Sequence, residues 1–99
     1  MRATEGFWTE TITTERLCER YRLLSERRRL VGDLARIEAR IAGVAPARAR
    51  LWERRRAQLE ATLCPAPNHA TLATLWRDQR ALTALLAAAS RDWLDVGAP

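Results

Sequence analysis

Apolar residues recur every three or four positions over most of this chain, a spacing typical of amphipathic helices. The pattern predicts three helices, over residues 13–42, 46–63 and 68–94. Residues 1–11 lack the periodicity and are expected to form a flexible N-terminal segment, so residues 12–96 are expected to form a single helical domain. We therefore predict an all-α fold.

Residues that favour helix ends stand at the limits of these segments. A hydroxyl of Thr13 or Thr14 can accept a hydrogen bond from an unpaired first-turn N–H. Gly43 suits the left-handed position after a helix, and Pro46 suits the first turn of the next helix. The motif CPAPN ends the second helix because proline cannot continue it, and its Asn68 is a good N-cap for the third. The chain thus predicts an antiparallel hairpin through the GVAP turn, followed by a third helix, as in a three-helix bundle.

The first helix carries two apolar stripes that point in different directions. One stripe comprises Leu30, Leu34, Ile37, Ile41 and Val44, and the other comprises Leu17, Tyr21, Leu24 and Val31. At 100° per residue the two are displaced by roughly 100°. Either this long helix is continuous, or it breaks near residues 25–32 and gives a four-helix fold, because a glycine inside a helix weakens it.

The third helix has the most regular pattern in the chain, with Gln79 as the polar member of its stripe. Its apolar positions are Leu72, Leu75, Leu82, Leu86, Ala89 and Trp93. The three helices differ in length, so a short second helix covers only part of the first, and the third is expected to overshoot the hairpin tip. Two apolar ends are expected to lack an intrachain neighbour: Leu17, Tyr21 and Leu24 at one, and Leu86, Trp93 and Leu94 at the other.

These unmatched ends favour a protein–protein interaction module, such as an assembly factor, a chaperone or an adaptor-like subunit. Burying a single leucine contributes on the order of 1.5–3 kcal/mol, so exposure of both ends would be costly. The expected partner is a second copy of the chain or a different protein, and a homo-oligomer is favoured. No catalytic activity is expected.

The charge balance supports an alternative function. All 17 basic residues are arginine, the acidic residues number 12, and the formal net charge is +5. Guanidinium groups bind phosphates well. The candidate phosphate-binding residues are Arg27, Arg28, Arg29, Arg54, Arg55 and Arg56. Consecutive arginines point in different directions around a helix, so nucleic-acid binding is the second hypothesis, and codon usage is a simpler source of the arginine excess.

Residues typical of cofactor and metal sites are sparse. His69 is the only histidine, and Cys18 and Cys64 are far apart in the sequence. A zinc site needs about four ligands, so no metal and no cofactor are expected. Two thiols and the lack of an apolar export segment favour the cytoplasm, and no run of residues is apolar enough for a membrane partner.

The segment LLSERRRLVGDLARIE, residues 23–38, resembles the first helix of the all-helical chorismate mutases. Their pattern has paired leucines, then an arginine, spaced aliphatic residues and a lysine. The resemblance matches Arg27 to that arginine. Glu38 stands where the family has a substrate-binding lysine, and Glu10 stands where it has an earlier arginine. The resemblance covers about one sixth of the chain and implies, as a third hypothesis, a degenerate helical enzyme of this kind.

Overall fold

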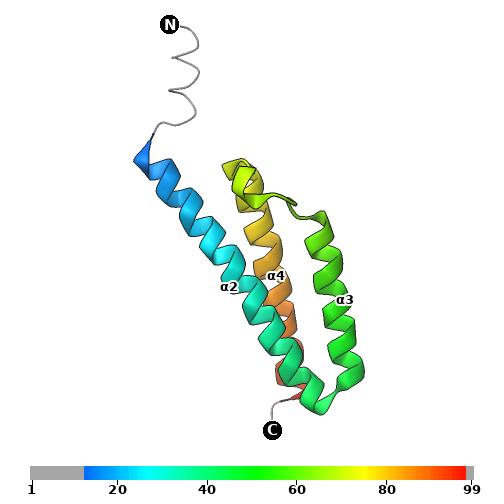
Figure 1. The fold of residues 1–99 in the computed structure, drawn as a ribbon. Coiled ribbons are helices and arrows are strands. Elements are labelled where there is room, and N and C mark those ends of the chain that lie inside the picture. Colours follow the sequence, from blue (N-terminus) through cyan, green and yellow to red (C-terminus); the bar gives the residue numbers. More distant parts are fainter. Residues whose placement is uncertain (1–12, 98–99) are drawn as a thin grey trace, which may run out of the picture.

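The computed structural model describes residues 13–97, and these residues form three long helices and one short turn (Figure 1). Helix α2 spans Thr14–Val44, α3 spans Pro46–Thr62 and α4 spans Leu72–Val96, with a 3-10 turn, η1, at Pro67–His69. No strand occurs among the described residues. The all-α prediction is confirmed. The predicted flexible segment, residues 1–11, lies outside the described part of the chain.

Helix α2 is continuous, so the four-helix alternative is wrong. The Thr13 side chain caps its first turn by accepting a hydrogen bond from the backbone N–H of Arg16 at 3.1 Å. The helix passes through Gly32, where an added Cβ would lie no closer than 3.7 Å to any side-chain atom of Arg36. Good helix formers on both sides of Gly32 maintain the hydrogen-bond pattern across the one weak position.

The hairpin forms at the predicted place, but Gly43 does not end α2. No glycine among the described residues has a positive φ, and the helix continues to Val44. Ala45 makes the turn with φ −146° and ψ 75°, outside the helical region, and Pro46 then opens α3, where its missing N–H costs nothing. The prediction of a left-handed Gly43 is therefore wrong, because one non-helical residue with a negative φ, Ala45, is sufficient to reverse the chain.

Helix α4 begins four residues later than predicted. Asn68 lies within η1, and Thr71 caps α4 by accepting from the backbone N–H of Thr74 at 3.2 Å. The guanidinium group of Arg20 on α2 donates to the backbone carbonyls of Pro67, Asn68 and Ala70, the first at 3.3 Å. These bonds hold the residues of CPAPN against α2 and delay the start of α4.

Helix α2 makes most of the contacts between helices, and α3 runs antiparallel to it and α4 parallel to it (Figure 1). Contacts between α3 and α4 are few compared with those that each makes with α2. The main core lies between the three helices, and its buried members are Leu30, Leu34, Ile41, Ala49, Trp52, Leu63, Leu82 and Ala89. Leu23 and Leu75 are buried nearer the start of α2. Leu30, Leu34 and Ile41 of the first predicted stripe are buried and Ile37 packs against them, as the spacing predicts. Val44, at 55% exposure, faces solvent at the end of α2, so its predicted place in this stripe is wrong.

The C-terminal apolar end does not lack an intrachain neighbour, contrary to the prediction. Leu86 and Trp93 are partly buried and pack against the core, and only Leu94, at 64% exposure, faces solvent. The connection between α3 and α4 carries the chain back to the level of Arg20 before α4 starts, so α4 ends beside the hairpin tip and does not overshoot it (Figure 1).

Candidate interaction surface

The outward side of α2 carries a long surface with a single charged residue. We call this surface the outer face, and its members lie within an arc of about 100° around the helix. They are Leu17, Tyr21, Leu24, Ser25, Arg28, Gly32, Ala35, Ala39 and Ala42. Leu24 and Gly32 are half-buried and the others are exposed. Apart from Arg28 the outer face has no charge, although 29% of the chain is charged.

Two large apolar side chains of the outer face, those of Leu17 and Tyr21, are exposed to solvent. Leu17 is 52% exposed and Tyr21 is 72% exposed. The same part of α2 is held on its other side by α4, because the indole N–H of Trp76 donates to Glu19 Oε1 at 2.5 Å and the Arg22 guanidinium carbon lies 4.9 Å from the centre of the Trp76 ring. These contacts fix the rotation of α2 about its own axis, so that Leu17 and Tyr21 point away from α4.

A shallow groove runs between the outer face and the η1 turn. One hollow of about 310 Å³ is lined by Leu17, Arg20, Tyr21, Leu24 and Asn68. A second, of about 480 Å³, is lined by Leu24, Arg27, Arg28, Val31, Gly32, Pro67 and Asn68. Leu24 and Asn68 border both hollows, so the groove is continuous. Its lining combines the apolar side chains of Leu17, Leu24 and Val31 with arginines, and grooves lined by apolar side chains bind helices in other proteins.

The six candidate phosphate-binding arginines do not gather on one surface. Three are in ion pairs: Arg27 with Asp78, Arg29 with Glu26 and Asp33, and Arg56 with Glu38 and Glu60. Hydrogen bonding to Glu38 raises the pKa of Arg56. Arg28 lines the groove on α2, and Arg55 lies over the Trp52 ring at 4.8 Å, in a different cleft. Arg54 is exposed and has no ion pair among residues 13–97.

A buried carboxylate joins the three helical segments near the middle of α2. Asp78 is 1% exposed, and its Oδ2 accepts from Arg27 at 2.7 Å and from the Cys64 backbone N–H at 3.0 Å. Arg77 donates to Oδ1 at 2.9 Å, and Arg27 also donates to the Cys64 carbonyl at 3.0 Å. Burial raises the pKa of Asp78, but these hydrogen bonds outweigh it and hold the pKa below its ordinary value. The polar member buried in the α4 stripe is thus Asp78, whereas Gln79 is half-buried.

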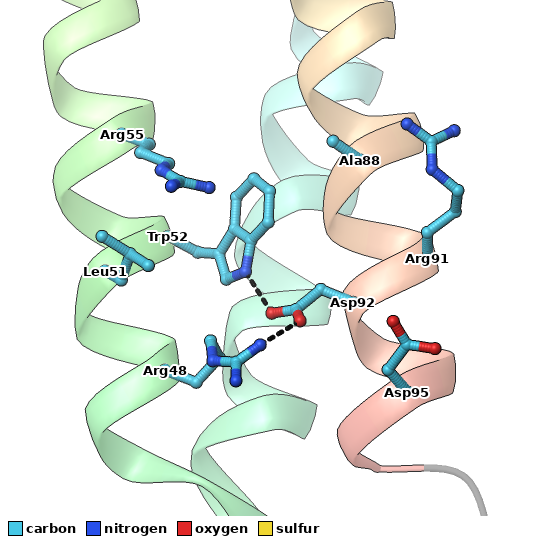
Figure 2. Close-up of a pocket in the computed structure, with 8 residues that line it drawn as sticks. All are labelled: Arg48, Leu51, Trp52, Arg55, Ala88, Arg91, Asp92 and Asp95. Atoms are coloured by element: carbon cyan, nitrogen blue, oxygen red, sulfur yellow. Dashed lines mark hydrogen bonds and ion pairs between the residues drawn. The ribbon is translucent and has the colours of Figure 1, made fainter.

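A second polar contact links α3 to α4 across a cleft of about 350 Å³ (Figure 2). The Trp52 indole N–H donates to Asp92 Oδ2 at 2.5 Å, and Arg48 forms an ion pair with the other oxygen of Asp92. Arg91 and Asp95 also line the cleft. Both oxygens of Asp92 are therefore occupied by residues of α3. These bonds join two helices that otherwise contact each other little.

No group of three or more potential metal ligands occurs within the described part of the chain. Cys18 is exposed and Cys64 is half-buried, and both thiols are free. His69 is exposed at the end of η1. Among residues 13–97 no helix is both long and apolar enough to cross a membrane.

The residues that carry the chorismate mutase resemblance are engaged within the chain. Arg27 pairs with Asp78, Glu38 accepts from Arg56 Nε at 2.9 Å, and Glu10 lies outside the described residues. Comparison with protein-family models, curated proteins and solved structures finds no match.

Sequence reasoning missed the C-terminal half of the outer face. Ala35, Ala39 and Ala42 give no signal in an apolar-stripe analysis, because alanine is common on every side of a helix. A search for absent charge would have found them, since arginine or a carboxylate stands at most other outward positions of α2. Asp78 was also detectable, because it lies three residues after Leu75 and four before Leu82, within the buried stripe of α4.

Proposed function

We propose that this chain is a non-enzymatic helical protein–protein interaction module, of the assembly-factor, chaperone or adaptor class, and that its docking surface is the outer face of α2. The observation that carries the proposal is the near absence of charge on an exposed helix surface about 38 Å long. A solvated face would be expected to carry arginine and glutamate, as other outward positions of this chain do. Exposed apolar surface of this kind is typical of interaction sites.

The exposed side chains on the outer face supply the recognition elements. Tyr21 has a large apolar ring with a polar end, a combination enriched at protein interfaces. Leu17 and Leu24 lie one turn away on either side of it. Asn68, which is exposed and lines the groove beside η1, adds a polar side chain. The proposal also locates the chain in the cytoplasm, a reducing compartment in which free thiols persist.

The test uses charge inserted on the outer face. Tyr21→Glu and Ala39→Glu each place a carboxylate where a partner would exclude water, which is costly for an unpaired charge. The matched control is Ala84→Glu, because Ala84 is an exposed alanine on α4. Assemblies are measured by light scattering of the pure chain and by quantitative co-purification from the native host, and far-UV circular dichroism reports the fold.

We expect both outer-face variants to lose the assembly while their helical signal stays that of the unchanged chain. The Ala84→Glu control should keep the assembly. If Tyr21→Glu and Ala39→Glu retain every assembly formed by the unchanged chain, the outer face is not the docking surface and the proposal is wrong.

One observation favours nucleic-acid binding as a second candidate. Arg50 and Arg54 are one turn apart on α3, are exposed, and have no ion pair among residues 13–97. Fluorescence anisotropy with a random-sequence duplex at about 50 mM salt tests this, because phosphate contacts weaken steeply as salt rises. Binding that is lost in the Arg50→Gln/Arg54→Gln variant would support this candidate, and no binding at low salt would contradict it.

A further inference from the structure

The two halves of the outer face differ in the size of their side chains. The N-terminal half presents Leu17, Tyr21 and Leu24, and the C-terminal half presents Ala35, Ala39 and Ala42. Arg28 and Gly32 lie between them. The large side chains thus stand at one end of the helix and the small ones stand at the other, at matching intervals from the centre.

This arrangement is complementary to itself when the direction of the helix is reversed. In an antiparallel pair with Arg28 and Val31 on either side of the two-fold axis, Leu17 of one copy lies opposite Ala42 of the other. Leu24 then lies opposite Ala35, and Tyr21 lies beside Ala39. Large residues facing small ones allow two helices to approach within 8–10 Å with their side chains interdigitated. A parallel pair would instead place large residues against large ones and leave the alanines apart.

We infer that the occupant of the outer face is a second copy of this chain, packed with its α2 antiparallel to the first. The inference rests on the proposed function, because it assigns a partner to the same surface. A two-fold interface uses one patch twice, so each contact is repeated. A foreign helix would need an independent pattern that matches the size gradient of α2, whereas a second copy already carries it.

Arg28 gives a pair of identical chains a salt dependence that other occupants of the outer face would not share. Near the two-fold axis the two Arg28 side chains lie on neighbouring turns, each beside Gly32 of the other copy, and no carboxylate lies on the outer face of either. Their repulsion opposes pairing and is screened by salt. We therefore expect association to strengthen as salt rises, and Arg28→Gln to tighten it severalfold. An acidic helix as the partner would produce the reverse of both results.

The direction of the pair can be tested by crosslinking. In a Cys18→Ser/Cys64→Ser background, chains carrying Leu24→Cys are mixed with chains carrying Ala35→Cys and treated with a short bismaleimide. We expect a crosslinked dimer from the mixture and little from either variant alone or from an Ala84→Cys control. Crosslinking of Leu24→Cys with itself would indicate a parallel pair and would overturn the inference.

A volume-exchange variant tests the register without a crosslinker. Leu24→Ala and Ala35→Leu each disturb the packing between copies, and the double variant restores a leucine opposite an alanine. We expect each single variant to dimerise more weakly than the unchanged chain and the double variant to recover. Thermal unfolding at low protein concentration checks that each variant folds.

Different results would exclude the second copy as occupant and the outer face as docking surface. If the unchanged chain scatters light as a monomer at every concentration, the second copy is excluded as the occupant. Co-purification of another protein that is lost in Ala39→Glu would then leave the outer face as a docking surface for that protein. If Ala39→Glu changes neither measurement, the proposed function fails together with the inference.

Discussion

Asp78 is the residue on which the three helical segments converge. Its carboxylate pairs with Arg27 of α2, whose side chain is 17% exposed, and accepts the backbone N–H of Cys64 after α3. Asp78→Ala would leave the partly buried guanidinium group of Arg27 without a carboxylate, holding only its bond to the Cys64 carbonyl, and would leave the Cys64 N–H without an acceptor. Removing one member of a buried ion pair typically costs about 3–5 kcal/mol. We expect a loss of this order in the free energy of unfolding, measured by urea denaturation.

The control for this loss is Glu53→Ala on α3. Glu53 is exposed and has no ion pair among residues 13–97, so its replacement should change the free energy of unfolding by no more than about 0.5 kcal/mol. Equal stability of Asp78→Ala and Glu53→Ala would show that the Asp78 contacts contribute little, since a hydrophobic replacement sometimes compensates for a lost ion pair.

The stability of the chain should also depend on the ionisation of Asp78. Burial raises its pKa, but the hydrogen bonds from Cys64, Arg77 and Arg27 prevail, and the pKa in the folded chain is lowered. The folded state therefore binds this proton less readily than the unfolded state. The resulting stabilisation is complete above the ordinary aspartate pKa of about 3.9 and is lost as pH falls through the lower folded value.

Denaturation of the unchanged chain and of Asp78→Asn, followed from neutral pH into the acid range, measures this contribution. We expect the unchanged chain to lose more stability than Asp78→Asn over that interval, since the amide cannot titrate. Parallel losses in the two proteins would contradict a lowered Asp78 pKa.

At the scale of the elements, the Asp92 contact joins α3 to α4. Asp92 accepts from the Trp52 indole at 2.5 Å and pairs with Arg48, and the two helices make few other contacts (Figure 2). Loss of a hydrogen-bond partner for a buried group costs about 1–3 kcal/mol. We expect Asp92→Ala to let α3 move away from α4, with faster amide hydrogen exchange in α3 than in the α2 segment that packs on α4.

The comparison for this prediction is Asp95→Ala, one turn further along α4. Asp95 is exposed and contacts neither Trp52 nor Arg48 by a hydrogen bond among the described residues. Exchange in α3 should be unchanged in Asp95→Ala. Equal acceleration in both variants would show that α4 as a whole is destabilised and that Asp92 has no special role in holding α3.

The helix boundaries that local chemistry decides were predictable, and those decided by distant residues were not. Thr13 and Pro46 act on neighbouring backbone groups, so the sequence around them was sufficient. The start of α4 depends on Arg20, which binds the carbonyls of the η1 turn from a remote part of the chain. No window around Asn68 contains that contact, and the predicted third helix was therefore too long at its N-terminus.

At the scale of the molecule, the exposure of some apolar residues could be predicted from the sequence and that of others could not. The exposure of Leu17 and Tyr21 follows from their place around α2, which the spacing of residues defines. The burial of Leu86 and Trp93 depends on how far the α3–α4 connection runs back along α2, toward Arg20, before α4 begins. That distance is a property of the folded chain. The partner-binding roles of all these residues stay predictions.

Self-association through α2 would also make the thermal stability of the protein depend on its concentration. A copy that binds the folded chain and not the unfolded chain raises the melting temperature by mass action. We expect the midpoint of the unchanged chain to rise over about a hundred-fold range of concentration, as measured by scanning calorimetry. Ala39→Glu should melt at the same temperature throughout, close to the midpoint of the unchanged chain at its lowest concentration, because the carboxylate blocks pairing and the monomer core is untouched. A concentration-independent midpoint for the unchanged chain would mean that the outer face of α2 stays in water in the pure protein, and that its occupant is another molecule.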